Sequence, residues 1–221
     1  MMMRAYPETY LDDAMNALGD MFDYVVYDCA YNLAEFYSFF LVSGVAYAFG
    51  RGAPKYVAGL SGPELAAAVL WKTKGERPQA EPSENIDKSP EYWAGWILAY
   101  YQWYTGRSFA ELNELGITTD HLLNIYPTLH EADVSKFVAL ADALIEKNAR
   151  GRATKLQTIR KAVGLTQKAL ANEAGVTLRM IQLYEQRNKD INKAQAITLA
   201  RIARVLGCRI ESLLESEPHI S

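Results

Sequence analysis

Apolar residues recur along the chain mostly at three- and four-residue spacing, which is the period of an α-helix. Leu11, Met15, Leu18, Phe22 and Val25 form one such stripe, with acidic residues between them. No stretch has the strict alternation of apolar and polar residues, bounded by turn residues, that is typical of a β-hairpin. The pattern therefore predicts an all-α fold.

The first two thirds of the chain divide into helices separated by turn residues. Ser61 and Ser108 are each followed three residues later by glutamate, which predicts helix starts with capping boxes. Ser89 before Pro90 predicts another start, and the helix that follows is apolar nearly all round, so we expect it at the centre of its domain. The expected helices span residues 10–29, 33–49, 61–72, 91–106, 119–126 and 131–147, with a polar loop over 73–89.

Charge and aromatic residues are distributed unevenly along the chain. Residues 1–145 carry 9 Lys and Arg against 19 Asp and Glu (net −10), whereas residues 146–221 carry 14 against 7 (net +7). Of the aromatic residues, only Tyr184 lies in the second part. Such asymmetry indicates that one part meets nucleic acid and the other does not. We expect two domains, an acidic aromatic-rich one over 1–147 and a basic one over 153–217, with a hinge beginning at Asn148.

Several other classes of protein are disfavoured. The uncharged runs that begin at Phe36 and Tyr92 are shorter than the roughly 20 apolar residues of a membrane-spanning helix, and the first residues do not form a secretion signal, so we expect a cytoplasmic protein. Cys29 and Cys208 stand alone, and His121 is too far from His130 for a helical metal pair. No Gly-rich phosphate loop or nucleophile with its base is visible. We expect no membrane contact, metal, cofactor or catalytic residue, and therefore no enzyme.

The basic part has a regular order of short helices. The five helical stretches span residues 156–164, 165–175, 176–186, 193–207 and 208–215. Particular residues stand at fixed positions in this pattern: G-L-T-Q at 164–167, L-A at 170–171, A-G-V at 174–176, Ile181, Glu185 and L-G-C at 206–208. From Leu156 onward the chain resembles the XRE family of helix-turn-helix proteins, to which Cro and the phage repressors belong. The resemblance implies a five-helix, repressor-like DNA-binding domain.

The residues of this part also have physical roles of their own. Gly175 suits the left-handed backbone at the end of the first helix of the pair. Val176, Ile181 and Tyr184 lie on one side of the next helix and are expected to pack on Leu170 and Ala174. The resemblance further implies an internal ion pair between Arg160 and Glu185, for which we expect a structural role.

The resemblance places the second helix of the pair in the major groove of double-stranded DNA. It implies base-facing positions at Thr177, Leu178, Arg179, Gln182 and Leu183. It implies phosphate contacts at Thr166, Gln167, Arg187, Asn188, Lys189 and Lys193, although Arg187 stands where the family usually has glycine. Arg suits guanine and Gln suits adenine.

Two leucines on this face of the helix are compatible with either DNA or a protein as its ligand. Leu178 lies near the border of the buried stripe, whereas Leu183 points outward by helical phase. An apolar side chain there contacts either a thymine methyl or a protein.

The resemblance also implies partners. Useful specificity requires a homodimer on two half-sites, with the final helix or the N-terminal domain as the seam. The whole chain resembles helix-turn-helix proteins of Gram-positive bacteria that carry stretches like residues 92–109 and 126–132 and that we associate with small toxin-like genes. This implies an autorepressor of the antitoxin type with a toxin-like protein on residues 1–147. Two alternatives stay open: a one-component regulator that senses a small ligand, and an enzyme fused to a DNA-binding domain, the latter disfavoured because no catalytic set is found.

Overall fold

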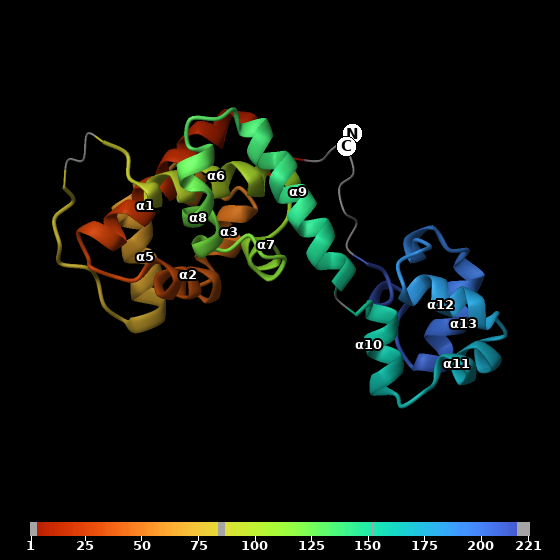
Figure 1. Cartoon of the computed structure of the whole chain (residues 1–221). Helices are drawn as coiled ribbons and strands as arrows, with labels where there is room; N and C mark the ends of the chain where they lie inside the picture. Colours follow the sequence, from red (N-terminus) through yellow and green to blue (C-terminus); the bar gives the residue numbers. More distant parts are fainter. Residues whose placement is uncertain (1–3, 84–86, 152, 216–221) are drawn as a thin grey trace. The chain divides into compact units, whose positions relative to one another are not determined.

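The computed structural model describes residues 4–83, 87–151 and 153–215, and within them the secondary structure is helical (Figure 1). The all-α prediction is confirmed. Contacts divide the chain into two compact units, Met1–Ile145 and Glu146–Ser221. Each unit has a hydrophobic core of its own. Among the described helices, none is long and apolar enough to cross a membrane.

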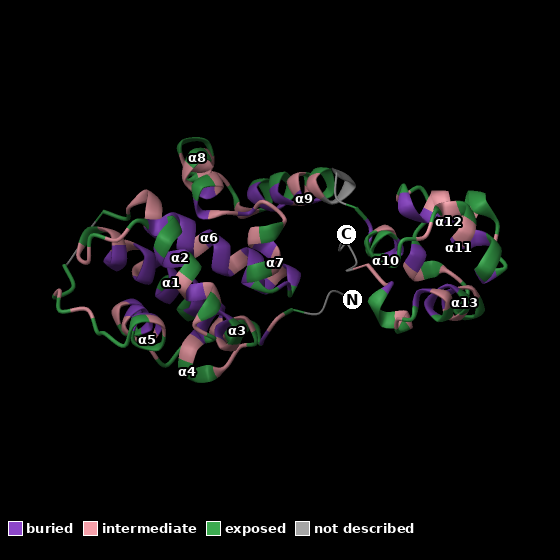
Figure 2. Cartoon of the chain, turned by 90° about the horizontal axis from the view of Figure 1, so that it is seen from below, coloured by how far each residue is buried: buried purple, intermediate pink, exposed green. Residues whose placement is uncertain are grey.

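The N-terminal unit is built on two long helices, α1 (Leu11–Tyr27) and α6 (Pro90–Thr105), which pack along each other. Most residues of α6 are buried, as Figure 2 shows, and this confirms its predicted central position. The other elements are η1 (Glu8–Tyr10), α2 (Leu33–Val42), α3 (Val45–Gly50), α4 (Pro54–Val57), α5 (Gly62–Lys74), α7 (Phe109–Glu114), α8 (Thr119–Leu129) and α9 (Val134–Gly151).

Helices α1 and α6 approach closely because glycines lie at their crossing. A Cβ atom added to Gly95 of α6 would lie 2.4 Å from the carbonyl oxygen of Leu18 and 2.9 Å from the Cα atom of Gly19. On the other helix, a Cβ atom at Gly19 would lie 2.8 Å from the ring of Tyr92. Side chains larger than hydrogen would therefore force the two helices apart.

The predicted helix starts of this unit are confirmed. The side chains of Ser61 and Ser108 accept hydrogen bonds from the backbone N–H of Glu64 and Glu111, and each glutamate accepts one in return, at 2.8 and 2.9 Å. Ser89 Oγ accepts a hydrogen bond of 3.0 Å from the N–H of Tyr92 at the start of α6. These caps satisfy amide groups that have no partner inside the helix.

The single helix predicted over residues 33–49 is wrong, because the chain forms two helices there, α2 and α3. Gly44 separates them with a left-handed backbone (φ +78°), which interrupts the helical hydrogen bonds. The hydroxyl of Ser43 donates to the carbonyl of Phe40 at 2.8 Å and accepts from the N–H of Val45 at 3.0 Å. The apolar run hid this break, since its periodicity is nearly continuous across Gly44.

The polar loop after α5 lies against α1. The hydroxyl of Tyr24 donates to the carbonyl of Ala80 at 2.6 Å, and Lys88 Nζ lies 3.2 Å from the carboxylate of Asp20. The loop is therefore tied to α1 by polar contacts. Helix α9 continues past the boundary at Ile145 to Gly151, so the hinge predicted to begin at Asn148 starts within a helix. Arg152 lies outside the described residues.

The C-terminal unit contains short helices around a small apolar core. Its elements are α10 (Lys155–Ala162), α11 (Gln167–Ala174), α12 (Leu178–Glu185), η2 (Ile191–Lys193), α13 (Ala196–Leu206) and η3 (Ile210–Ser212). The fifth of the predicted helices is a single 3-10 turn, η3. It follows Gly207, whose left-handed backbone (φ +64°) ends α13, and Leu213 just after it is buried in the core.

Candidate nucleic-acid interface

Helices α11 and α12 form a tight pair joined by a three-residue turn. Each begins with a threonine cap: Thr166 Oγ1 accepts a hydrogen bond of 3.0 Å from Ala169 N–H, and Thr177 Oγ1 accepts one of 3.2 Å from Met180 N–H. Gly175 ends α11 in the left-handed conformation (φ +62°), as its position in the sequence predicts. The turn therefore fixes the direction of α12 relative to α11.

The inner face of α12 is buried as predicted. Ile181 and Tyr184 are fully buried with Leu170 and Ala174 of α11, and Val176 packs at the edge of this core. Burial raises the pKa of the Tyr184 hydroxyl. Because this face is occupied by the core, the opposite face of α12 is the one available to a ligand.

A buried ion pair joins α10 to α12, and it confirms the predicted pairing of Arg160 with Glu185. The Nε and Nη2 atoms of Arg160 lie 2.5 and 2.9 Å from the two carboxylate oxygens, and hydrogen bonding to Glu185 raises the pKa of the guanidinium. Arg160 Nη1 also donates to the carbonyl of Leu165 at 2.6 Å. Gln167 Nε2 donates to Glu185 at 2.8 Å. One network thus holds the ends of α10, α11 and α12 together.

The five base-facing candidates differ in exposure. Thr177, Leu178 and Arg179 are exposed, whereas Gln182 and Leu183 are half-buried. Leu178 has 37 % of its surface exposed. The expectation from helical phase that Leu183 points outward is therefore only partly met, because Leu178, at the start of α12, is the more exposed of the two leucines.

Four of the phosphate candidates are exposed: Thr166, Asn188, Lys189 and Lys193. Lys189 lies along α12, with Nζ 3.7 Å from the sulfur of Met180. Lys193 Nζ is 3.8 Å from Asp190 and its side chain is 85 % exposed, so this weak pair leaves it in solvent. Three of the four, Asn188, Lys189 and Lys193, lie on the segment between α12 and α13, and Thr166 lies at the start of α11.

The other two phosphate candidates, Gln167 and Arg187, point to partners inside the unit. The side-chain amide of Gln167 belongs to the network of Glu185, which leaves its backbone N–H at the start of α11 for an anion. Arg187 takes the left-handed backbone (φ +56°) that glycine would supply, and its Nη1 lies 3.2 Å from Glu215. Glu215 is thus an internal partner for the Arg187 guanidinium, for which the resemblance implied a phosphate contact.

Glu215 is a residue that the sequence analysis missed. It is the last residue of the fifth helical stretch, and its partners Lys155, Arg187 and Asn192 are 60, 28 and 23 positions earlier in the chain. No periodic signal connects residues at such separations. Only the folded chain brings them together.

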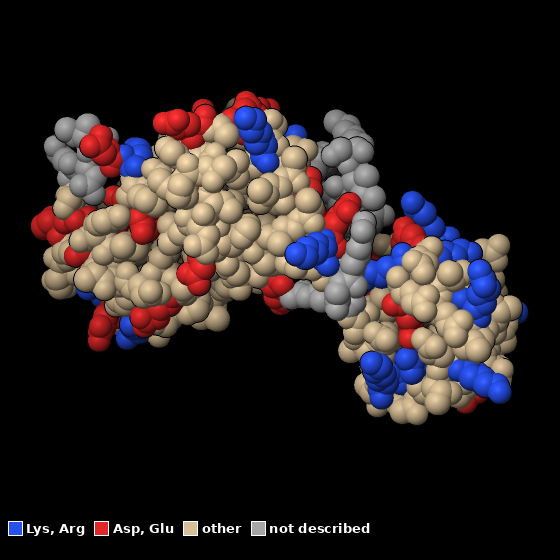
Figure 3. Space-filling view, in the orientation of Figure 1, with Lys and Arg blue, Asp and Glu red and all other residues tan. Residues whose placement is uncertain are grey.

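The charge of the C-terminal unit favours an anionic ligand. Figure 3 shows Lys and Arg side chains spread over its visible face, whereas Asp and Glu are prominent on the N-terminal unit. Among the residues of the C-terminal unit whose burial is described, eight cations are exposed besides Lys189 and Lys193: Lys147, Lys155, Lys161, Lys168, Arg179, Arg201, Arg204 and Arg209. A basic surface of this kind supplies the sequence-independent part of DNA affinity.

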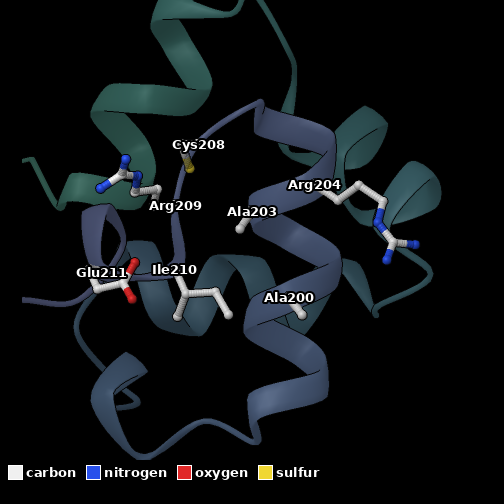
Figure 4. A pocket seen from close by; sticks show the side chains of 7 residues that line it. All are labelled: Ala200, Ala203, Arg204, Cys208, Arg209, Ile210 and Glu211. Carbon is white, nitrogen blue, oxygen red and sulfur yellow. The ribbon is translucent and has the colours of Figure 1, made fainter.

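A surface groove of about 610 Å³ lies between α13 and η3. Figure 4 shows Ala200, Ala203 and Ile210 facing the space between these two elements, whereas the Arg204 side chain extends away from it. Cys208 lines the groove, and burial raises the pKa of its thiol. The groove is thus apolar in its middle and charged at its rim.

Comparison with known families agrees with this geometry. Residues 156–213 match the family described as helix-turn-helix, so the C-terminal unit contains a helix-turn-helix domain, as the resemblance to the XRE type predicted. Comparisons with curated proteins and with solved structures give no match. The match supports a DNA-binding transcription regulator and leaves the N-terminal unit outside the matched residues.

Proposed function

We propose that the protein is a sequence-specific transcription regulator whose helix α12 enters the major groove of its operator. The observation that carries this proposal is the helix-turn-helix pair, with α12 buried on one side and Arg179 exposed on the other. Arg179 presents two donors to guanine, and Gln182, one turn further on, pairs with adenine. Thr177, Leu178 and Leu183 complete the base-facing set.

Phosphate contacts set the position of α12 on the duplex. Thr166, Asn188, Lys189 and Lys193 supply them through side chains, and Gln167 supplies its backbone N–H at the start of α11. Arg187 is left out of this set because its guanidinium pairs with Glu215. The phosphate contacts account for most of the salt-dependent affinity.

The regulator acts as a homodimer in this proposal. A single helix-turn-helix domain covers one half-site, and two half-sites lie about 34 Å apart on B-form DNA. The groove between α13 and η3, together with exposed Ile197 on α13, offers an apolar surface for a second copy. Light scattering of the full chain tests this, with Ile197→Arg as the variant that places a charge on the exposed part of this surface. A wild-type monomer in the presence of operator DNA would overturn the dimer.

The N-terminal unit binds a partner protein, in the manner of an antitoxin that represses its own operon. Its net charge of −10 suits a basic partner, and exposed Tyr27, Tyr47 and Trp71 are residue types that anchor protein interfaces. The test is co-expression with the protein encoded by the adjacent gene. A stoichiometric complex that changes operator affinity supports this role, and a neighbour that does not bind contradicts it.

DNA recognition is tested with the full chain on an operator selected from random duplexes. Arg179→Ala and Gln182→Ala are expected to weaken specific binding by about 1–3 kcal/mol and to leave binding to unrelated duplex nearly unchanged. Glu173→Ala, at an exposed position of α11, is the matched control. Equal weakening on every duplex would show that these side chains do not read bases.

A further inference from the structure

Glu215 binds three separate parts of the helix-turn-helix unit. Its Oε1 accepts a hydrogen bond of 2.7 Å from the backbone N–H of Lys155, the first residue of α10, and its Oε2 lies 3.2 Å from Nη1 of Arg187. Its backbone forms two hydrogen bonds with the side chain of Asn192, at 2.8 and 2.9 Å. A residue next to the end of the described chain is thus tied to α10, to the turn after α12 and to η2.

The surroundings and the backbone conformation of Arg187 favour a carboxylate partner for its side chain. Its side chain is 26 % exposed, that of Glu215 is 18 % exposed, and the Nε atom of Arg187 is buried without a hydrogen-bond partner. A guanidinium in such surroundings is stabilised by a nearby anion, since burial weakens its hydration. The left-handed backbone at Arg187 is strained for a residue with a Cβ atom, so further contacts are required to keep it there.

The loop that Glu215 ties down is the loop that carries phosphate candidates. Residues 186–193 include Asn188, Lys189 and Lys193, and the two anchoring points, Arg187 and Asn192, lie near its two ends. The backbone N–H groups of Asn188 and Lys189 both donate to the carbonyl of Leu183, at 2.9 and 3.1 Å. The position of the two lysines is thereby set by α12 on one side and by Glu215 on the other.

We propose that Glu215 is a positioning residue for DNA binding, which fixes the 186–193 loop and keeps the Arg187 charge away from the phosphates. This proposal rests on the proposed function. Lys189 and Lys193 then neutralise phosphates, while Arg187 does not, although it lies on the same loop. Loss of the Glu215 carboxylate releases a cation beside the DNA backbone and loosens the loop.

The experiment measures operator and unrelated-duplex affinity of the full chain over a range of salt concentrations. The variants are Glu215→Gln, Arg187→Gln, their double, and Lys189→Ala as a reference for the loss of one phosphate contact. Glu173→Gln is the matched control, since it removes the same charge from an exposed position of α11.

Glu215→Gln is expected to steepen the salt dependence by about 1 unit of slope, because the released guanidinium finds a phosphate. The ratio of operator to unrelated-duplex affinity is expected to fall about tenfold as the loop loosens. Arg187→Gln and the double variant are expected to keep the wild-type slope, since neither has a cation to release. A structural role alone would lower affinity in the double variant and in Glu215→Gln alike, without changing the slope.

Two further results would overturn the proposal. One is a decrease of about 1 in the slope of the salt dependence for Arg187→Gln, equal to the decrease for Lys189→Ala, because Arg187 would then be a phosphate contact. The other is a salt slope and an affinity ratio of Glu215→Gln that both equal those of the Glu173→Gln control. Failure of the wild-type chain to bind any selected duplex would instead overturn the proposed function, so the two failures are distinguishable. Circular dichroism spectra verify that each variant is folded.

Discussion

The guanidinium of Arg160 and the carboxylate of Glu185 form a two-point ion pair, at 2.5 and 2.9 Å, between helices α10 and α12. Only 9 % of the arginine side chain and 1 % of the glutamate side chain are exposed. A pair this buried gains little stability over an apolar substitute, yet it fixes geometry, because both charges require each other. The position of α12, the helix proposed to read DNA, therefore depends on a buried contact with α10.

Replacement of Glu185 by Gln is expected to destabilise the C-terminal unit by about 3–5 kcal/mol, since the Arg160 charge stays buried without its partner. Urea unfolding followed by far-ultraviolet circular dichroism measures the loss. Tryptophan fluorescence is an internal control, because all four tryptophans lie within residues 1–145 and report only on the other unit. Glu173→Gln, at an exposed position, is expected to leave both signals unchanged, and an equal effect of the two substitutions would contradict the prediction.

Local signals in the sequence predicted much of the fold because their causes are local. The capping boxes at Ser61 and Ser108, the cap at Ser89 and the left-handed Gly175 each depend on residues within one helical turn. The break at Gly44 was missed because apolar residues continue on both sides of it. Hydrophobic periodicity indicates which residues are buried, but it does not show where one buried helix ends and the next begins.

For the candidate site, the family resemblance predicted the helix pair and the Arg160–Glu185 ion pair, and the structure confirms both. The resemblance did not show that Gln167 joins that ion pair or that Glu215 holds Arg187. These contacts connect side chains that are far apart in the chain, and their residue types are equally suited to solvent or phosphate. Leu178 is also more exposed than Leu183, whereas helical phase predicted the reverse.

Gly95→Ala is expected to destabilise the N-terminal unit by about 3 kcal/mol. The added methyl group meets the backbone carbonyl of Leu18 at 2.4 Å, which cannot rotate away, so α1 and α6 must separate. Gly75→Ala is the comparison: its backbone is left-handed (φ +73°) but open space surrounds it, so the cost is about 1 kcal/mol of strain. Urea unfolding followed by tryptophan fluorescence measures both. Equal losses would show that the helix crossing tolerates the methyl group.

The stability of the N-terminal unit is expected to fall as the pH decreases through about 6.5, because burial lowers the pKa of His121 below its ordinary value. Its Nε2 atom is buried without a hydrogen-bond partner, so protonation is costly in the folded state. The unfolded chain therefore takes up the proton first, and acid favours unfolding. His121→Gln is expected to reduce this pH dependence, with a constant difference from wild type above about pH 7. Tryptophan-monitored unfolding at several pH values checks the sign, and a steeper dependence in the variant would refute it.

The exposed Leu178 at the start of α12 provides the last prediction, which concerns how the recognition helix reads thymine. If Leu178 contacts a thymine methyl group, Leu178→Ala weakens operator binding by about 1 kcal/mol, roughly the value of one buried methylene group. Replacement of that thymine by uracil removes the methyl group from the DNA side and is expected to cost a similar amount. The two changes together then cost no more than either alone, because they remove the same contact. Additive losses at every thymine of the operator would assign Leu178 to a protein contact instead, and Leu183→Ala, tested on the same uracil series, shows whether the less exposed leucine reads a base in its place.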